Sequence, residues 1–227
     1  MLGWNVPKHH IWFGIMRFAD GVFSTRKGNV IRLEQLMDEG KKRAYDIVNE
    51  KNPDLSFEEK DNIAEIVGVG AIKYADLSQN RQSPIIFEWD KILSFEGNTA
   101  PYLQYSYARI QSILRKAESE GKGIDFTKTI LVKTPQERAL ANHIAAFPMA
   151  VIKASETFKP NVIADYLFEL AKKFNSFYNS CPILNQEDEI LFSRGLLAKV
   201  AGETIKDGLD LLGIKTVSYT HLTLPTI

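Results

Sequence analysis

The sequence predicts a mainly α-helical fold with a short extended segment near its N-terminus. Three observations predict this class. Apolar residues recur at three- and four-residue spacing from about Leu33 to Leu212, which is the period of an amphipathic helix. Several of these runs open with a capping residue and end at glycine or before proline. Only the stretch from His9 to Phe18 is aromatic and β-branched enough to indicate a sizeable strand.

The composition fits a globular protein and restricts where a nucleic-acid site could lie. The 227 residues are 44% apolar and 25% charged, enough for one large domain or one domain plus part of another. The formal net charge is zero, so any nucleic-acid site must be a local patch. The single Cys181 excludes an internal disulfide and a zinc site built on several cysteines. No apolar run could span a membrane and no signal peptide precedes the strand, so we expect a cytoplasmic protein.

A basic loop follows the predicted strand. Asp20-Gly21 marks a turn, and the loop Phe23–Asn29 combines hydroxyl groups, two cations and a glycine. Such a loop can present backbone N–H groups and positive charge to phosphates. Taken alone this signal is weak, because basic glycine turns are common on protein surfaces.

Two helices should come next. Helical spacing runs from Leu33 to about Lys51, and Ser56 opens a capping box for a helix that reaches Leu77. The pair Gly68/Gly70 has no preceding strand and no third glycine, so it predicts close helix packing rather than a dinucleotide site. A short extended piece, Ile85–Phe87, follows a polar break.

The C-terminal half should contain further helices. One helix begins after the cap Thr99, with Pro101 in its first turn, and ends near Glu120 before Gly121. The others are expected from Thr134 to about Phe147, from Pro148 to Phe158, from Pro160 onward, and from Gln186 to Leu212. In the helix after Pro160, one apolar stripe should form core: Ile163, Leu167, Leu170, Phe174 and Phe177.

The helix after Thr99 has two distinct faces. At about 100° per residue, one narrow face carries its core residues, Leu103, Tyr107, Ile110 and Leu114. Tyr102, Tyr105 and Arg109 fall on another face. Two phenol rings and a guanidinium can stack on a base and bind phosphate. For an anonymous helix, long side chains lying over their neighbours are the simpler interpretation.

The run from Glu96 to Arg109, EGNTAPYLQYSYAR, resembles the start of the anticodon-binding domain of arginyl-tRNA synthetases. The resemblance covers the chain to about Ile214 and includes a second run, Tyr166–Pro182. It implies a helical-bundle anticodon-binding domain over 91–214, preceded over 1–90 by a partial α/β, Rossmann-type remnant of the catalytic domain. The tail 215–227 does not resemble the family, and we expect a frayed or foreign end there.

The Phe23–Asn29 loop resembles the mobile signature loop of class I aminoacyl-tRNA synthetases. Thr25 stands where the family's catalytic lysine is usual, which leaves open whether Arg26 or Lys27 supplies the charge. The resemblance implies that catalytic residues come from Ser24, Thr25, Arg26 and Lys27, and nucleotide contacts from Phe23, Gly28 and Asn29.

The resemblance also implies the partners of the intact enzyme: arginine, ATP with Mg²⁺, and arginine tRNA. We expect the protein to bind no metal ion of its own. We also expect it to be a monomer. A His-x-Gly-His motif of the class I nucleotide site is absent from the sequence, so we expect no aminoacylation by this chain alone. The residues implied to bind tRNA, around the central anticodon cytosine, are Asn98, Tyr102, Gln104, Tyr105, Arg109 and Tyr178.

Three interpretations compete: part of a synthetase, a free-standing RNA-binding helical module, and a helical scaffold with no RNA role. The Phe23–Asn29 loop favours the first, because a binding module does not need it. The face formed by Tyr102 and Arg109 separates the first two interpretations from the third.

Overall fold

Helices make up most of the structure, a computed structural model that describes residues 7–18, 21–22, 32–122 and 127–217. The mainly α prediction is therefore confirmed. In chain order the elements are β1 Met16–Phe18, β2 Gly21–Val22, α1 Leu33–Lys51, α2 Phe57–Leu77, β3 Ile85–Phe87, α3 Trp89–Ile92, α4 Ala100–Ser119, α5 Pro135–Ala145, α6 Phe147–Thr157, α7 Asn161–Ser180 and α8 Asp188–Leu211.

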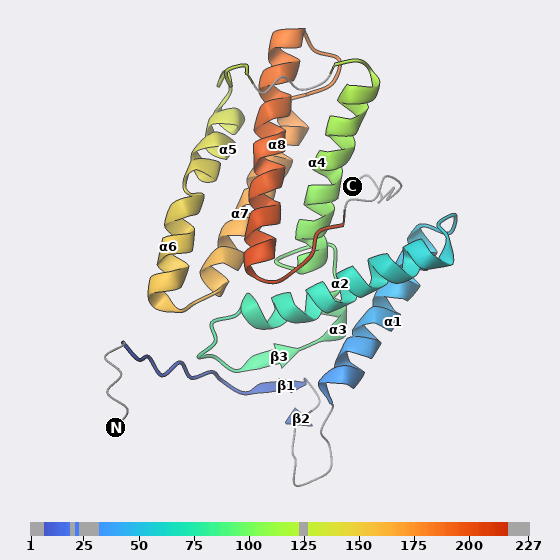
Figure 1. Cartoon of the computed structure of the whole chain (residues 1–227), viewed down its shortest axis with the longest axis vertical. Helices are drawn as coiled ribbons and strands as arrows, with labels where there is room; N and C mark the ends of the chain where they lie inside the picture. The colour runs from blue at the N-terminus through green and yellow to red at the C-terminus, as the bar shows by residue number, and fades with distance from the viewer. Residues whose placement is uncertain (1–6, 19–20, 23–31, 123–126, 218–227) are drawn as a thin grey trace.

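Helices α4 to α8 form a bundle around a single apolar core. Figure 1 shows α4, α7 and α8 running alongside one another, with α5 and α6 placed end to end on one side. The predicted stripe of α7 lies at the centre: Leu167, Leu170, Phe174 and Phe177 are all 0% exposed. The predicted core face of α4 is also confirmed, since Leu103 and Ile110 are fully buried.

The break between α5 and α6 occurs at Ala146, just before the proline that signals it. Pro148 lies in the first turn of α6, where its missing N–H costs no hydrogen bond. At the other end of α6, Phe158 adopts a left-handed conformation with φ of 54° and turns the chain into α7. The two short helices therefore run end to end along the bundle.

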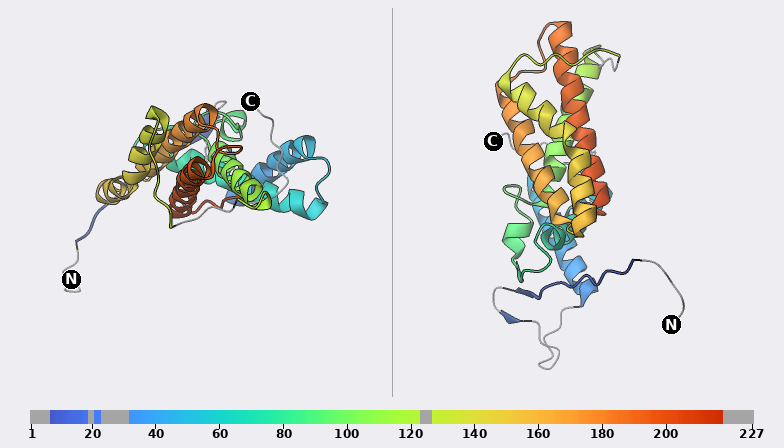
Figure 2. Two further views of the ribbon diagram at one scale, coloured as in Figure 1. Left: turned by 90° about the horizontal axis from the view of Figure 1, so that it is seen from above. Right: turned by 90° about the vertical axis from the view of Figure 1, so that its left-hand side faces the viewer.

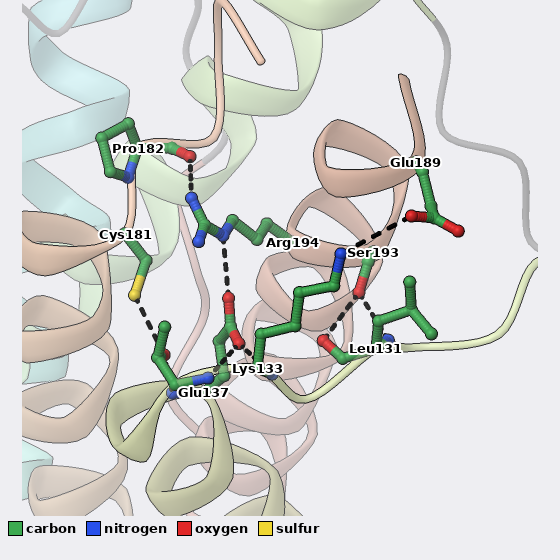
Figure 3. A network of polar contacts seen from close by, with 9 residues as sticks. Leu131, Lys133, Glu137, Cys181, Pro182, Glu189, Ser193 and Arg194 are labelled. Atoms are coloured by element: carbon green, nitrogen blue, oxygen red, sulfur yellow. Dashed lines mark hydrogen bonds and ion pairs between the residues drawn. The ribbon is translucent and has the colours of Figure 1, made fainter. Parts of the chain in front are cut away.

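Helix α5 is fixed to α8 by a buried charged network (Figure 3). The Glu137 carboxylate is 2.8 Å from Arg194 Nε and accepts hydrogen bonds from the backbone N–H groups of Lys133 and Thr134. Arg194 also donates to the Pro182 carbonyl at 2.7 Å. Burial raises the pKa of the Glu137 carboxyl, but the bonds from Arg194 and the two N–H groups outweigh it and lower that pKa.

Helices α1 and α2 form a hairpin that crosses one end of the bundle (Figure 1). A Cβ on Gly68 would lie 2.5 Å from the Gly40 carbonyl oxygen, so the two backbones touch at a point where no side chain fits. This confirms the predicted packing role of Gly68. The hairpin has its own apolar cluster, which includes Ala44, Val48, Ile63 and Val67.

The sheet is small and lies beyond the hairpin, away from the bundle (Figure 2, right). Its strand order is β2-β1-β3, with β1 antiparallel to β2 and parallel to β3, where Met16 pairs with Ile85. The predicted strand from His9 is wrong over its first part, because β1 begins only at Met16. Arg81 binds the segment before β1: its Nη1 atom donates to the Trp12 carbonyl at 2.5 Å, and its own carbonyl accepts from the Gly14 N–H at 2.6 Å.

The segment after α8 returns to the junction between the bundle and the hairpin. Ile214 and Val217 are 1% and 2% exposed, and the Lys215 carbonyl accepts a 2.8 Å hydrogen bond from Gln104 Nε2. The expected frayed end is therefore wrong for 215–217, because Val217 is buried and the Lys215 carbonyl is bonded to α4. The rest of the expected atypical tail, 218–227, lies outside the described residues.

Candidate nucleic-acid interface

Helices α4 and α7 bring five polar or aromatic side chains into one connected group. We call it the α4–α7 cluster, and it consists of Tyr102, Tyr105, Arg109, Asn175 and Tyr178. The first three come from one face of α4, as the helical spacing predicts, and the last two come from α7. The two helices run in the same direction at a sequence offset near 66, so successive turns of α4 meet successive turns of α7.

Arg109 is at the centre of the cluster. Its guanidinium carbon lies 4.5 Å from the centroid of the Tyr105 ring and 5.6 Å from that of Tyr178. Its two terminal nitrogens donate to the Asn175 Oδ1 atom, at 3.3 Å, and to the Tyr105 hydroxyl. Within the described part of the chain Arg109 has no carboxylate partner, so its positive charge is not neutralised locally. The group can therefore bind an anion or an acceptor edge.

Two aromatic rings of the cluster remain accessible, Tyr178 beside the arginine and Tyr102 on the other side of Asn175. Tyr178 is 37% exposed, and its ring stacks against Phe174 of the core at 6.1 Å. Tyr102 is half-buried, with its ring edge-on to Phe168 at 5.7 Å, and its hydroxyl accepts a 2.8 Å hydrogen bond from Asn175 Nδ2. Because the two rings pack against Phe168 and Phe174, they offer a rigid face on which a base can stack.

Asn98 lies apart from the cluster. It precedes the first turn of α4, about three turns before Arg109. Its Oδ1 atom accepts a 2.5 Å hydrogen bond from the Tyr74 hydroxyl, and its Nδ2 atom is 3.5 Å from Asp165. Burial, with Asp165 nearby, raises the pKa of the Tyr74 hydroxyl. The structure thus does not join Asn98 to the other predicted tRNA-binding residues.

The cavity beside Asn98 has the wrong charge for a phosphate. It has a volume of about 460 Å³ and lies between α2, α3 and the loop before α4. Three carboxylates and one lysine are among the side chains that line it: Glu88, Asp90, Glu96 and Lys91. A nucleic acid backbone would be repelled there, whereas the α4–α7 cluster presents a cation.

Gln104 is inside the protein rather than on its surface. The side chain is 3% exposed, and its Nε2 atom donates to the carbonyls of Ile66 and Lys215 at 3.3 and 2.8 Å. The amide therefore ties α4 to α2 and to the segment after α8. Because it has no free surface, we leave Gln104 out of the proposed RNA-binding face.

Two segments of this chain match family descriptions. Residues 103–219 match the DALR anticodon binding domain, and residues 3–89 match the catalytic domain of class I (R) tRNA synthetases. The α4–α7 cluster lies almost wholly within the first segment. The chain belongs to the arginyl-tRNA synthetase family.

Individual relatives agree with the family assignment. The chain is 67% identical over 214 residues to the arginine–tRNA ligase of Fusobacterium nucleatum, covering 94% of this chain and 38% of that protein. It is 47% identical over 209 residues to the Chromobacterium violaceum ligase, covering 92% of this chain and 36% of that protein. The chain thus spans a little over a third of the length of these members of the family.

Solved structures of the family share the fold. The arginyl-tRNA synthetase of Thermus thermophilus superposes with a TM-score of 0.80 at 34% identity, covering 92% of this chain and 35% of that chain. The Plasmodium falciparum enzyme gives a TM-score of 0.74 at 30% identity, covering 91% and 34%. The resemblance found in the sequence is confirmed, and the scaffold without an RNA role loses its support.

The predicted signature loop falls outside the described residues, which omit 23–31. This concerns all the residues assigned to catalysis or nucleotide contact: Phe23, Ser24, Thr25, Arg26, Lys27, Gly28 and Asn29. These roles stay predictions. Among the described residues, the parallel pair β1–β3 is too small a part of a class I sheet to form a nucleotide pocket by itself.

The described residues form neither a metal-binding cluster nor a membrane-spanning helix. Over 7–18, 21–22, 32–122 and 127–217 there is no group of three or more His, Cys, Asp or Glu side chains placed to hold a metal ion. No helix in those ranges is long and apolar enough to cross a membrane.

Sequence reasoning missed one member of the cluster, Asn175. It lies between Phe174 and Phe177, two fully buried residues of the α7 stripe, and its polar side chain faces α4. A polar residue three positions before Tyr178 shares its side of the helix, which is a signal that could have found it. Its actual partners, Tyr102 and Arg109, are set by how α4 and α7 align.

Proposed function

We propose that this chain is the tRNA-recognising part of an arginine–tRNA ligase. The α4–α7 cluster would bind an unstacked base of the anticodon loop of arginine tRNA. One observation carries this proposal: Arg109 lies between two tyrosine rings, without a carboxylate partner among the described residues, in a family whose domain here is named for anticodon binding.

The chemistry of the cluster suits a single-stranded loop. An unstacked base can lie on the Tyr178 or Tyr102 ring, and each such contact contributes about 1–3 kcal/mol. Arg109 can donate to a base acceptor or to a phosphate. Because the chain has no net charge, this local cation rather than a general basic field would supply the electrostatic attraction.

The complete ligase would attach arginine to tRNA with ATP, and Mg²⁺ would accompany the nucleotide. The Phe23–Asn29 loop would place positive charge near the phosphates, with Arg26 or Lys27 as its source. We further propose a cytoplasmic monomer. This chain contains no His-x-Gly-His motif, so we infer that it binds tRNA but does not activate arginine unaided.

Binding of anticodon stem-loops tests the proposal. The 227-residue chain should bind a stem-loop with cytosine at the central anticodon position more tightly than the same stem-loop with that base changed. Tyr102→Ala and Arg109→Ala should each stay folded and lose this preference. Arg138→Ala is the matched control, because it removes an exposed arginine from α5.

Two results would contradict the proposal. Discrimination that survives both substitutions would show that this face does not read the base. An equal loss in Arg138→Ala would show that the effect comes from overall charge alone.

A further inference from the structure

Asn175 connects the two polar groups at the centre of the α4–α7 cluster. Its Oδ1 atom is 3.3 Å from Arg109 Nη1, and its Nδ2 atom is 2.8 Å from the Tyr102 hydroxyl. A guanidinium has only donors, so the amide oxygen must face Arg109. The amide nitrogen must then face Tyr102, and the orientation of this amide is fixed by its neighbours.

The orientation of the Asn175 amide determines where the hydrogen of the Tyr102 hydroxyl can point. Its oxygen accepts from Asn175, so its own hydrogen cannot point at that amide. The Tyr105 hydroxyl likewise accepts from Arg109, which leaves its hydrogen unused. Neither hydroxyl hydrogen has an acceptor among the described residues. Both phenol hydrogens are therefore available to a ligand.

Through Tyr102, Tyr105 and Arg109, the outward face of the cluster consequently offers donors: the two phenol O–H groups whose oxygens already accept, and the remaining N–H groups of Arg109. A ligand that fits must present acceptors. Cytosine carries neighbouring acceptors at O2 and N3, whereas uracil places an N–H donor at position 3 between its acceptors O2 and O4. Two neighbouring donors of the protein can therefore both bond to O2 and N3 of cytosine, whereas against uracil the donor that faces N3 would meet the N–H of the base and both would lose their hydrogen bonds.

We propose that Asn175 is a positioning residue that makes the α4–α7 cluster a donor surface and so favours cytosine over uracil. This inference rests on the proposed function, because it concerns the same RNA-binding face. Asn175 acts through Tyr102 and Arg109 and need not touch the base itself.

The sharpest test is Asn175→Asp. The carboxylate keeps the size of the side chain and still accepts from Arg109, but it cannot donate to Tyr102. The Tyr102 hydroxyl then turns its hydrogen inward and ceases to donate to the ligand. We expect the ratio of dissociation constants for uracil and cytosine stem-loops to fall about threefold to tenfold, the value of one neutral hydrogen bond.

Asn179→Asp is the matched control. Asn179 is exposed, lies one turn further along α7, and undergoes the same change of charge. This variant should weaken binding of both stem-loops alike and leave their ratio unchanged. A ratio that falls equally in Asn179→Asp would overturn the inference, because charge alone would then explain it.

Tyr102→Phe separates positioning from a merely structural role. Alone it should lower the ratio as much as Asn175→Asp, and this measurement remains decisive if Asn175→Asp does not fold. In the Tyr102→Phe background, Asn175→Asp should change the ratio no further, because no hydroxyl is left to turn. A further fall would indicate general damage to the site and would overturn the inference.

The outcomes distinguish the two proposals. If the unmodified chain shows no preference for the cytosine stem-loop, the proposed function fails, and this inference fails with it. If the unmodified chain prefers cytosine and either folded Asn175→Asp or Tyr102→Phe keeps the full preference, only the role of Asn175 is overturned.

Discussion

The bundle and the sheet bury their apolar residues to very different extents. In the bundle, the α7 stripe from Leu167 to Phe177 is completely enclosed. Around the sheet, large apolar side chains face outward: Phe13 is 82% exposed, Ile15 67% and Ile86 54%. Five helices can close a core among themselves, whereas three short strands cannot cover both of their faces.

The two regions also differ in what each contributes to a functional site. The bundle combines a closed core with an ordered polar cluster on its surface, as a binding domain requires. The sheet belongs to the segment that matches the class I catalytic domain, where β1 pairs with β3 and Arg81 bonds to the segment before β1. We expect binding to reside in the bundle and catalysis to need more sheet than is present here.

The largest expected effect is therefore that this chain does not activate arginine with ATP, the first step of the ligase reaction. The purified chain should show no arginine-dependent exchange of pyrophosphate into ATP, with or without tRNA, because the class I nucleotide motif is missing from its sequence. A radiolabelled exchange assay measures this directly, with a full-length ligase as the positive control. Exchange above background would refute the division of roles.

The next largest effect is a difference in the free energy of unfolding when an apolar side chain is shortened to alanine in the bundle or near the sheet. Phe174→Ala removes a ring that is 0% exposed in the bundle and should lower the free energy of unfolding by about 3–5 kcal/mol. Phe13→Ala, on a side chain 82% exposed, should change it by no more than about 0.5 kcal/mol. Urea titrations followed by circular dichroism compare the two variants. Similar losses would mean that the sheet also has a closed core.

The Phe23–Asn29 loop should affect turnover only in a full-length ligase, in which the catalytic site is complete. In a full-length ligase carrying this segment, replacing both Arg26 and Lys27 with alanine removes the cations expected near the phosphates. Turnover should fall about 10²–10³-fold, while tRNA affinity should change far less. Steady-state aminoacylation and tRNA binding measured on the same variant provide the check. Unchanged turnover would remove this loop from the mechanism.

The smallest expected effect concerns acid stability of the bundle. Because the pKa of Glu137 is lowered in the folded protein, its contribution to stability is present above the ordinary value of 4.5 and is lost as pH falls through the folded value. Glu137→Gln should therefore be less stable near neutrality and lose less stability below pH 4.5. Thermal unfolding across this range gives the comparison. The partly exposed pair Lys41–Asp61 in the hairpin serves as a control, and Lys41→Met should have little effect.

Local rules predicted most of the helical framework correctly. Thr99, Ser56 and Thr134 each cap the helix expected of them, accepting from a backbone N–H three residues later at 3.2–3.3 Å. The faces of α4 and α7 also lie where their spacing places them. These features depend on residues within about four positions of one another, so the sequence contains all the information that they need.

Which of those faces meet depends on the packing of helices that are far apart in the sequence. Asn175 contacts Arg109 across 66 positions, and Gln104 reaches Lys215 across 111. Neither pairing follows from helical periodicity, because periodicity gives the face of a residue but neither its partner helix nor its height along that helix. Local sequence patterns were thus enough to predict the helices and their caps, and the motif from Glu96 to Arg109 was enough to predict the family. The packing of α4 against α7 determined that three side chains predicted on one surface join two from another, while Gln104 and Asn98 do not.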